Sequence, residues 1–192
     1  MQDLVMQKAE LRRRIRKQRR EQDPETLRQE SLRACERLLS LPELQTACCV
    51  FCYVSCKGEA VTLSLIEQLL SQGKHVLVPR CKDEGQMDCV EIHSLNELVP
   101  GMMNIPEPPP EAPVTPSERV EFAVVPALAC GEDGSRLGQG GGYYDRFLEQ
   151  ANCSFAALCL DAFLLPSVPT EEHDRRMMMI VTQSRLLRFE DV

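Results

Sequence analysis

Apolar residues follow two patterns that alternate along this chain of 192 residues. Some stretches are short continuous apolar runs, which predict strands that are buried on both faces of a sheet. Such runs lie at residues 48–54, 75–79, 87–93, 121–126, 154–160 and 177–181. Between them, apolar residues recur at helical spacing, which predicts helices that pack on the sheet.

A few local signals indicate where these helices begin and end. One helix begins at residues 23–24, where an aspartate N-cap precedes a proline, and it is predicted to stop at Pro42. A second helix over residues 62–72 ends at Gly73, a residue type that favours the position after a helix. A third begins at Tyr143.

This alternation predicts a single α/β domain over residues 1–192. We expect a mostly parallel central sheet flanked by helices, in a Rossmann-like α/β/α layering, with ligands bound beyond the carboxyl ends of the strands. Residues 100–117 contain seven prolines and are predicted to form a stiff surface connection without structure of its own.

Composition indicates a cytoplasmic protein. The N-terminus is polar, without the apolar core of a signal peptide, so the ten cysteines are interpreted as reduced thiols. No apolar run approaches the roughly 18 residues of a membrane span. Four cysteines fall close together, at Cys48, Cys49, Cys52 and Cys56. Because no second ligand pair lies at a distance, we interpret them as core thiols and not as zinc ligands.

Positive charge is concentrated in residues 1–20, which hold eight Lys or Arg in a chain of net charge −7. Apolar residues of this segment recur at helical period, at Leu4, Leu11 and Ile15. The segment is therefore predicted to be a basic helix packed on the body. Lys8 lies inside the apolar stripe, where an ammonium is costly unless it meets an anion. We expect Lys8 and Arg12 to face something negative; a Lys8 side chain that extends to solvent is an equal alternative.

Six of the ten glycines lie between Gly131 and Gly142, after a predicted strand and before a predicted helix. Glycine lets the backbone adopt positive φ and bring N–H groups close to a phosphate, and a helix N-terminus adds a positive dipole end. We interpret the segment as an anion site, with a flexible turn as the alternative. It matches neither a Walker A loop nor the spacing of the dinucleotide fingerprint.

Two charged residues flank these glycines, Arg136 before them and Asp145 after them. A phosphate site needs a cation, and Mg²⁺ needs a carboxylate near the phosphate oxygens. An acid in the first turn of a helix also interacts favourably with the helix dipole. Position alone leaves both roles open for Asp145.

The string GSRLGQGGGYYDRFL, at residues 134–148, resembles the signature of the 5-formyltetrahydrofolate cyclo-ligase family, also called 5,10-methenyltetrahydrofolate synthetases. Further similar segments follow in family order along nearly the whole chain. They are KAELR at 8–12, YVSCKGE at 53–59, NIPEP at 104–108 and HDRRMMMIVT at 173–182.

The resemblance implies an enzyme that converts 5-formyltetrahydrofolate and ATP to 5,10-methenyltetrahydrofolate, ADP and phosphate with Mg²⁺. It also implies roles for individual residues. ATP would be bound by Lys8, Arg12, Arg136, Leu137, Gly138, Gln139, Gly140, Gly141, Gly142, Tyr143 and Tyr144. The residues expected to act in catalysis are Arg136, Tyr143 and Asp145. The folate would be bound by Val54, Glu59 and Tyr143, and Mg²⁺ by Asp145 and Asp174.

Two other functions remain open at this point. A sugar-phosphate isomerase or acyl-CoA transferase on a related sheet would need a general base or a Glu nucleophile, for which Glu59 is the candidate. A nucleic-acid-binding protein would use residues 8–20, although the acidic remainder of the chain and the absence of tryptophan argue against it. We expect small-molecule partners, no nucleic acid, no membrane and a monomer.

Overall fold

The computed structural model describes residues 2–101 and 105–190 and contains one eight-stranded sheet with two small accessory sheets. The α-helices are α1 (Gln2–Glu21), α2 (Pro24–Leu39), α3 (Pro42–Thr46), α4 (Leu63–Ser71) and α5 (Tyr143–Gln150). The strands of the large sheet are β1 (Cys49–Cys52), β2 (His75–Cys81), β3 (Met87–Ile92), β6 (Val114–Thr115), β7 (Phe122–Pro126), β10 (Ser154–Leu158), β12 (Met179–Val181) and β13 (Leu186–Arg188). The accessory strands are β4 (Val99–Pro100), β5 (Pro106–Glu107), β8 (Ala129–Gly131), β9 (Arg136–Leu137) and β11 (Leu164–Leu165). Short 3₁₀ turns are η1 (Asp83–Gly85), η2 (Leu95–Glu97), η4 (Ser117–Arg119) and η5 (Asp161–Phe163).

The large sheet confirms the predicted α/β class and its mostly parallel arrangement. Its strand order is β13-β12-β10-β7-β1-β2-β3-β6. The strands from β12 through β2 run parallel to one another. At the edges, β13 is antiparallel to β12, β3 is antiparallel to β2, and β6 is antiparallel to β3. The carboxyl ends of β1, β2, β7 and β10 therefore lie at one end of the sheet, where an α/β fold binds its ligands.

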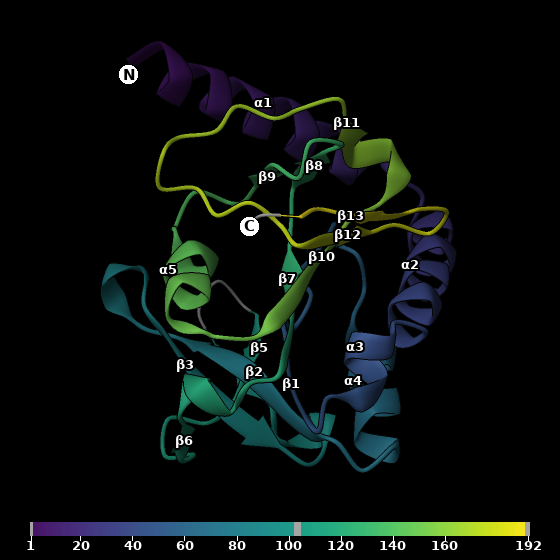
Figure 1. Cartoon of the computed structure of the whole chain (residues 1–192), viewed down its shortest axis with the longest axis vertical. Helices are drawn as coiled ribbons and strands as arrows, with labels where there is room; N and C mark the ends of the chain where they lie inside the picture. The colour runs from purple at the N-terminus through teal and green to yellow at the C-terminus, as the bar shows by residue number, and fades with distance from the viewer. Residues whose placement is uncertain (1, 102–104, 191–192) are drawn as a thin grey trace.

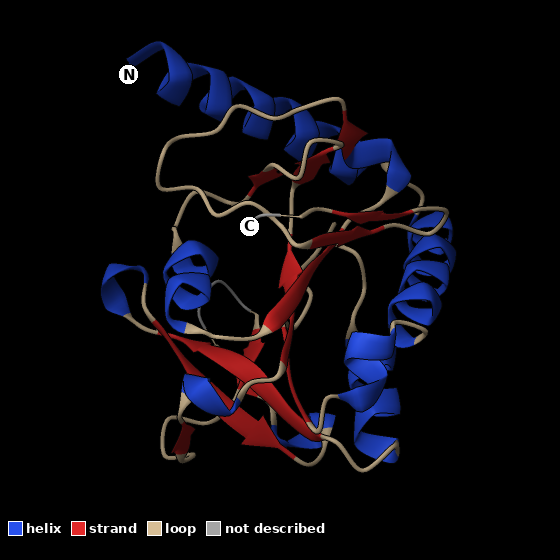
Figure 2. Cartoon of the chain, viewed as in Figure 1, coloured by secondary structure: helices blue, strands red, loops and turns tan. Residues whose placement is uncertain are grey.

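Helices cover both faces of the sheet, which gives the expected layers (Figure 1). The helices α2, α3 and α4 lie on one side, α5 lies on the other, and α1 crosses one end of the molecule (Figure 2). Strand β1 shows how alternate residues serve the two faces. Phe51 stacks on Phe147 of α5 with ring centroids 4.4 Å apart. The neighbouring residue Cys52 lies near Cys35 of α2, and both thiols are buried.

The predicted helix over residues 23–41 ends slightly earlier than expected, and a second helix follows it. The helix that starts after Asp23 ends at Leu39, and Pro42 begins the separate helix α3 instead of merely stopping the first one. Proline at a first helical turn loses no hydrogen bond, because that N–H has no partner inside the helix.

The proline-rich segment also has structure, contrary to the prediction. Strand β4 pairs with β5, and β6 adds an edge strand to the large sheet beside β3. Edge positions tolerate proline because one side of an edge strand needs no donor. Asn104 of the NIPEP string lies outside the described residues.

A single buried arginine fastens α1 to the loops at the end of the sheet. The guanidinium of Arg19 donates to the carbonyl oxygens of Gly58 at 2.6 Å, Ala127 at 2.7 Å and Leu128 at 2.8 Å. It also lies 4.4 Å from the centre of the Phe163 ring. Arg19 thereby joins α1 to the segments that follow β1, β7 and β10.

Within the described ranges, no helix is both long enough and apolar enough to cross a membrane.

We predict that Arg19→Leu lowers the free energy of unfolding by on the order of 3 kcal/mol, because it leaves buried carbonyl oxygens without donors. The matched control is Arg20→Leu, since Arg20 is the next residue and is exposed. Urea unfolding followed by circular dichroism measures both. Equal stability of the two variants would show that the Arg19 contacts contribute nothing.

Candidate functional site

Residues 138–142, which we call the glycine loop, connect β9 to the start of α5. Gly140 has a φ of 104° and Gly142 a φ of 69°, both in the region that side chains disfavour. A Cβ at Gly141 would lie 2.7 Å from the ring of Tyr143. The loop therefore requires glycine at these three positions. Among the described residues, no side chain caps the N-terminus of α5.

Three arginines bind the carbonyl oxygens of the glycine loop. Arg12 donates from Nε to Gly138 at 3.0 Å, and Arg16 donates from Nη2 to the Gln139 carbonyl at 3.0 Å. Arg146 donates from Nη1 to Gly141 at 2.9 Å. Two of the three belong to α1, so the N-terminal helix and the glycine loop form one unit with strong positive charge.

Of the two alternatives that the sequence left open for Lys8, the structure has the one in which its ammonium meets negative charge. Lys8 is only 4% exposed, and its Nζ lies 2.6 Å from Glu171 and 2.5 Å from Asp174. Leu11 and Ile15 of the same stripe are buried. The Lys8 ammonium lowers the pKa of Glu171 through its hydrogen bond. In this structure the anion is thus a pair of the protein's own carboxylates.

Arg136 and Asp145 also bind each other. Nη2 of Arg136 lies 2.7 Å from Oδ1 of Asp145, and the arginine side chain is almost fully buried. Nη1 donates to the Pro126 carbonyl at 3.2 Å, whereas Nε is buried without a partner among the described residues. The Arg175 amide donates to the same Asp145 oxygen at 3.4 Å. This contact brings α5 next to the segment that carries Asp174.

Potential metal ligands gather in that segment. Ligand-type atoms of Glu171, His173 and Asp174 all lie within 4.8 Å of one another. Asp145 is not in this group. Because Asp145 accepts from the amide of Arg175, which follows Asp174, the two carboxylates that the resemblance assigns to Mg²⁺ belong to adjoining segments. Each carboxylate is paired with a cation that the resemblance assigns to phosphate, Asp145 with Arg136 and Asp174 with Lys8.

The loop after β1 reaches the same region from the other side. Val54 and Glu59 are both buried, and Glu59 accepts a hydrogen bond from the Cys56 amide at 3.1 Å. Burial, with the nearby Glu59 carboxylate, raises the pKa of Tyr144 well above its usual value. At the start of α5, Tyr143 donates from its hydroxyl to the Lys82 carbonyl at 3.2 Å.

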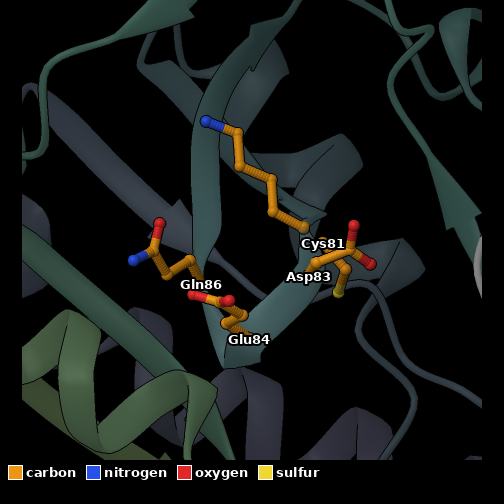
Figure 3. A pocket seen from close by; sticks show the side chains of 5 residues that line it. Cys81, Asp83, Glu84 and Gln86 are labelled. Carbon is orange, nitrogen blue, oxygen red and sulfur yellow. The ribbon is translucent and has the colours of Figure 1, made fainter.

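A hollow of about 460 Å³ lies at the turn between β2 and β3, next to these residues. Figure 3 shows the side chains that line it, from Cys81, Lys82, Asp83, Glu84 and Gln86. Arg146 of α5 donates to the Gly85 carbonyl in this turn at 3.1 Å, so the hollow adjoins the glycine loop. It is a shallow hollow that is open to solvent.

A model of the 5-formyltetrahydrofolate cyclo-ligase family matches residues 5–183. The chain belongs to this family. The cyclo-ligase of Escherichia coli K12 is 33% identical over 178 residues, which cover 90% of this chain and 98% of that protein. The cyclo-ligase of Mycolicibacterium smegmatis is 31% identical over 179 residues, covering 88% and 90%.

A solved structure agrees with this assignment. The 5,10-methenyltetrahydrofolate synthetase of Aquifex aeolicus matches with a TM-score of 0.85 and 29% identity, covering 96% of this chain and 94% of that one. The synthetase of Mycoplasma pneumoniae, at 16% identity and a TM-score of 0.75, has the same fold. The family prediction made from the sequence is confirmed.

The structure brings together residues to which the cyclo-ligase resemblance assigns roles and other residues that it does not mention. The resemblance did not single out Glu171, Arg16 or Arg146, nor the turn between β2 and β3. Arg16 lies one helical turn after Arg12, which is a signal that could have been used. Nothing in the sequence alone pairs Glu171 with Lys8, because 163 residues separate them.

The clustered cysteines provide a test of metal content. All ten cysteines are free, and Cys49 and Cys52 are buried in β1 while Cys48 is exposed. Among the described residues, the one group of three potential metal ligands contains no cysteine, so the clustered cysteines do not form a zinc site. We predict no stoichiometric zinc by elemental analysis, and no change in melting temperature with a chelator when Mg²⁺ and ATP are absent. One tightly bound zinc per chain would contradict this.

We predict that Asp145→Asn impairs metal binding as well as stability. The amide keeps an acceptor for Arg136 but loses the charge, so the ligand-free protein should lose about 1 kcal/mol of stability. Because a Mg²⁺ ligand is also lost, the extra stabilisation that Mg²⁺ gives to the ATP-bound protein should largely disappear. Glu149→Gln, at an exposed acid of the same helix, is the control. Normal Mg²⁺-dependent stabilisation in Asp145→Asn would show that Asp145 is a structural partner of Arg136 and not a metal ligand.

Proposed function

We propose that this protein cyclises 5-formyltetrahydrofolate to 5,10-methenyltetrahydrofolate and converts ATP to ADP and phosphate. Membership of the cyclo-ligase family supports the folate chemistry. The use of ATP is supported by one observation above all, the cations that surround the glycine loop at the carboxyl end of the sheet.

The reaction needs ATP for a chemical reason. A formamide carbon is a poor electrophile, and its oxygen is a poor leaving group. Transfer of the γ-phosphoryl group to that oxygen makes it a phosphate ester. N10 of the folate then attacks the carbon and closes the ring, and the formyl oxygen departs with the phosphate. In such a reaction the protein contributes mainly by positioning and by stabilising charge.

The residues around the glycine loop are suited to bind a nucleoside triphosphate. The absence of Cβ atoms at residues 140–142 lets the backbone come close to a ligand, and the uncapped start of α5 offers N–H groups and the positive end of a dipole. Arg136 has a buried Nε without a partner among the described residues. Together with Arg136, the cations Lys8 and Arg12 would neutralise the phosphates. Residues 137–144 form the proposed phosphate-binding segment.

The residues also fit Mg²⁺. Asp145 and Asp174 supply hard carboxylate oxygens of the kind that Mg²⁺ prefers, and each is neutralised here by a cation, as a metal ion would neutralise it. When bound, Mg²⁺ supplies positive charge against the phosphate oxygens during transfer. Asp145 orients the Arg136 guanidinium, which would stabilise the transferring phosphoryl group.

The folate is proposed to bind between the loop after β1 and the start of α5. Val54 provides an apolar surface, and the Glu59 carboxylate is suited to the donor edge of a pterin. Tyr143 would pack near the folate and shape the geometry of transfer. The hollow beside the turn between β2 and β3 adjoins this position and extends the space for the substrate.

The remaining proposals concern partners and place. Of the cations on α1, Lys8, Arg12, Arg16 and Arg19 all bind groups of this chain, which supports a packed helix and not a nucleic-acid-binding arm. We propose small-molecule substrates, a monomer and a cytoplasmic location. The ten free thiols support the location. Large exposed apolar side chains, scattered over α1, α4, β4 and β6, support the monomer.

We predict that the purified protein, mixed with 5-formyltetrahydrofolate and Mg-ATP, produces the near-ultraviolet absorbance of the methenyl product and one ADP per product. Omission of ATP should abolish both signals, which distinguishes the cyclo-ligase from an isomerase or acyl-CoA transferase that needs no ATP. No absorbance change with ATP intact would refute the proposed function.

A further inference from the structure

The two carboxylates that bind Lys8 are not held equally. Asp174 accepts a second hydrogen bond, from the Glu171 amide at 2.6 Å, and its side chain is 14% exposed. The Glu171 carboxylate is 23% exposed, and Lys8 is its hydrogen-bond donor among the described side chains. His173 lies 3.8 Å away, too far for a hydrogen bond. Glu171 is therefore the more easily displaced of the two.

The buried Lys8 ammonium has little room for a further ligand. The Lys8 side chain is buried, and two of the three donors of its ammonium are used by Glu171 and Asp174. A phosphate that binds this ammonium also comes close to both carboxylates, because both already lie within hydrogen-bond distance of Lys8 Nζ. Like charges at such separation repel, and burial weakens the screening by water.

We propose that Glu171 is a positioning residue that holds Lys8 while the nucleotide is absent and competes with the nucleotide phosphate for it. This inference rests on the proposed function, since it takes Lys8 to be a phosphate ligand. On binding, Lys8 passes from Glu171 to a phosphate oxygen, while Asp174 stays in place through its hydrogen bond from the backbone. Glu171 thus lowers the affinity for ATP in exchange for an ordered, charge-balanced site.

The chain offers a matched control beside Glu171. Glu172 is the next residue, is exposed, and has no ion pair within the part of the chain that the structure describes. Glu171→Gln and Glu172→Gln remove the same charge one residue apart. A general effect of net charge on an anionic ligand acts on both variants alike, whereas competition for Lys8 acts only on the first.

The test is calorimetry of ATP binding to the full chain, with EDTA and separately with Mg²⁺, for the unaltered protein and both variants. In EDTA, Glu171→Gln should bind ATP about three- to tenfold more tightly than Glu172→Gln, because the competing charge is gone. The gain in affinity on adding Mg²⁺ should be smaller in Glu171→Gln. Its melting temperature without ligand should lie below that of Glu172→Gln, because Lys8 loses a charged partner.

The outcomes separate this inference from the proposed function. Equal affinities of the two variants, or weaker binding by Glu171→Gln, would overturn the competition. A merely structural Glu171 would lower the melting temperature without tightening ATP binding, which also overturns it. If the unaltered, folded protein bound no ATP in either condition, the proposed function itself would fail.

Discussion

Three buried cations join the helices, loops and strands that form the candidate site of this structure. Lys8, Arg19 and Arg136 are each less than a tenth exposed. A buried charge is costly unless it is paired or fully hydrogen-bonded. Lys8 and Arg136 are paired with carboxylates, and Arg19 donates to three carbonyl oxygens, although the Nε atoms of Arg19 and Arg136 have no partner among the described residues. Lys8 ties α1 to the segment before β12, Arg19 ties it to the ends of β1 and β7, and Arg136 ties β9 to α5.

The same requirement connects folding with the proposed chemistry. Without a ligand, the cations proposed to bind phosphate neutralise the carboxylates proposed to bind Mg²⁺, so on this proposal the site is charge-balanced before a substrate binds. In the proposed complex, Mg-ATP would supply a cation to the carboxylates and an anion to the cations. Exchange of partners then replaces a large rearrangement, because the residues already lie on fixed elements.

Sequence reasoning succeeded where a local pattern has one physical solution. The glycine loop and the helix that starts at Tyr143 were predicted at the observed positions, since positive φ and a helix start leave a clear signal. The place of Lys8 in an apolar stripe left burial and extension to solvent equally open, and the structure has it buried. What the sequence could not reveal was pairing over long distances. Neither Glu171 as the partner of Lys8 nor the short strands β8 and β9 can be read from a local period, because strands of two or three residues show none. The roles taken from the family resemblance remain proposals.

On this proposal, the cations of the site exchange their carboxylate partners for phosphate oxygens when Mg-ATP binds. The most direct measurement is a crystal structure of the protein with Mg²⁺ and a non-hydrolysable ATP analogue. We predict that the Lys8 ammonium lies on a phosphate oxygen and has left Glu171, that the phosphates lie along residues 138–142, and that Asp145 and Asp174 bind the metal. A complex in which Lys8 still binds both carboxylates, with the phosphates bound away from the glycine loop, would contradict the account.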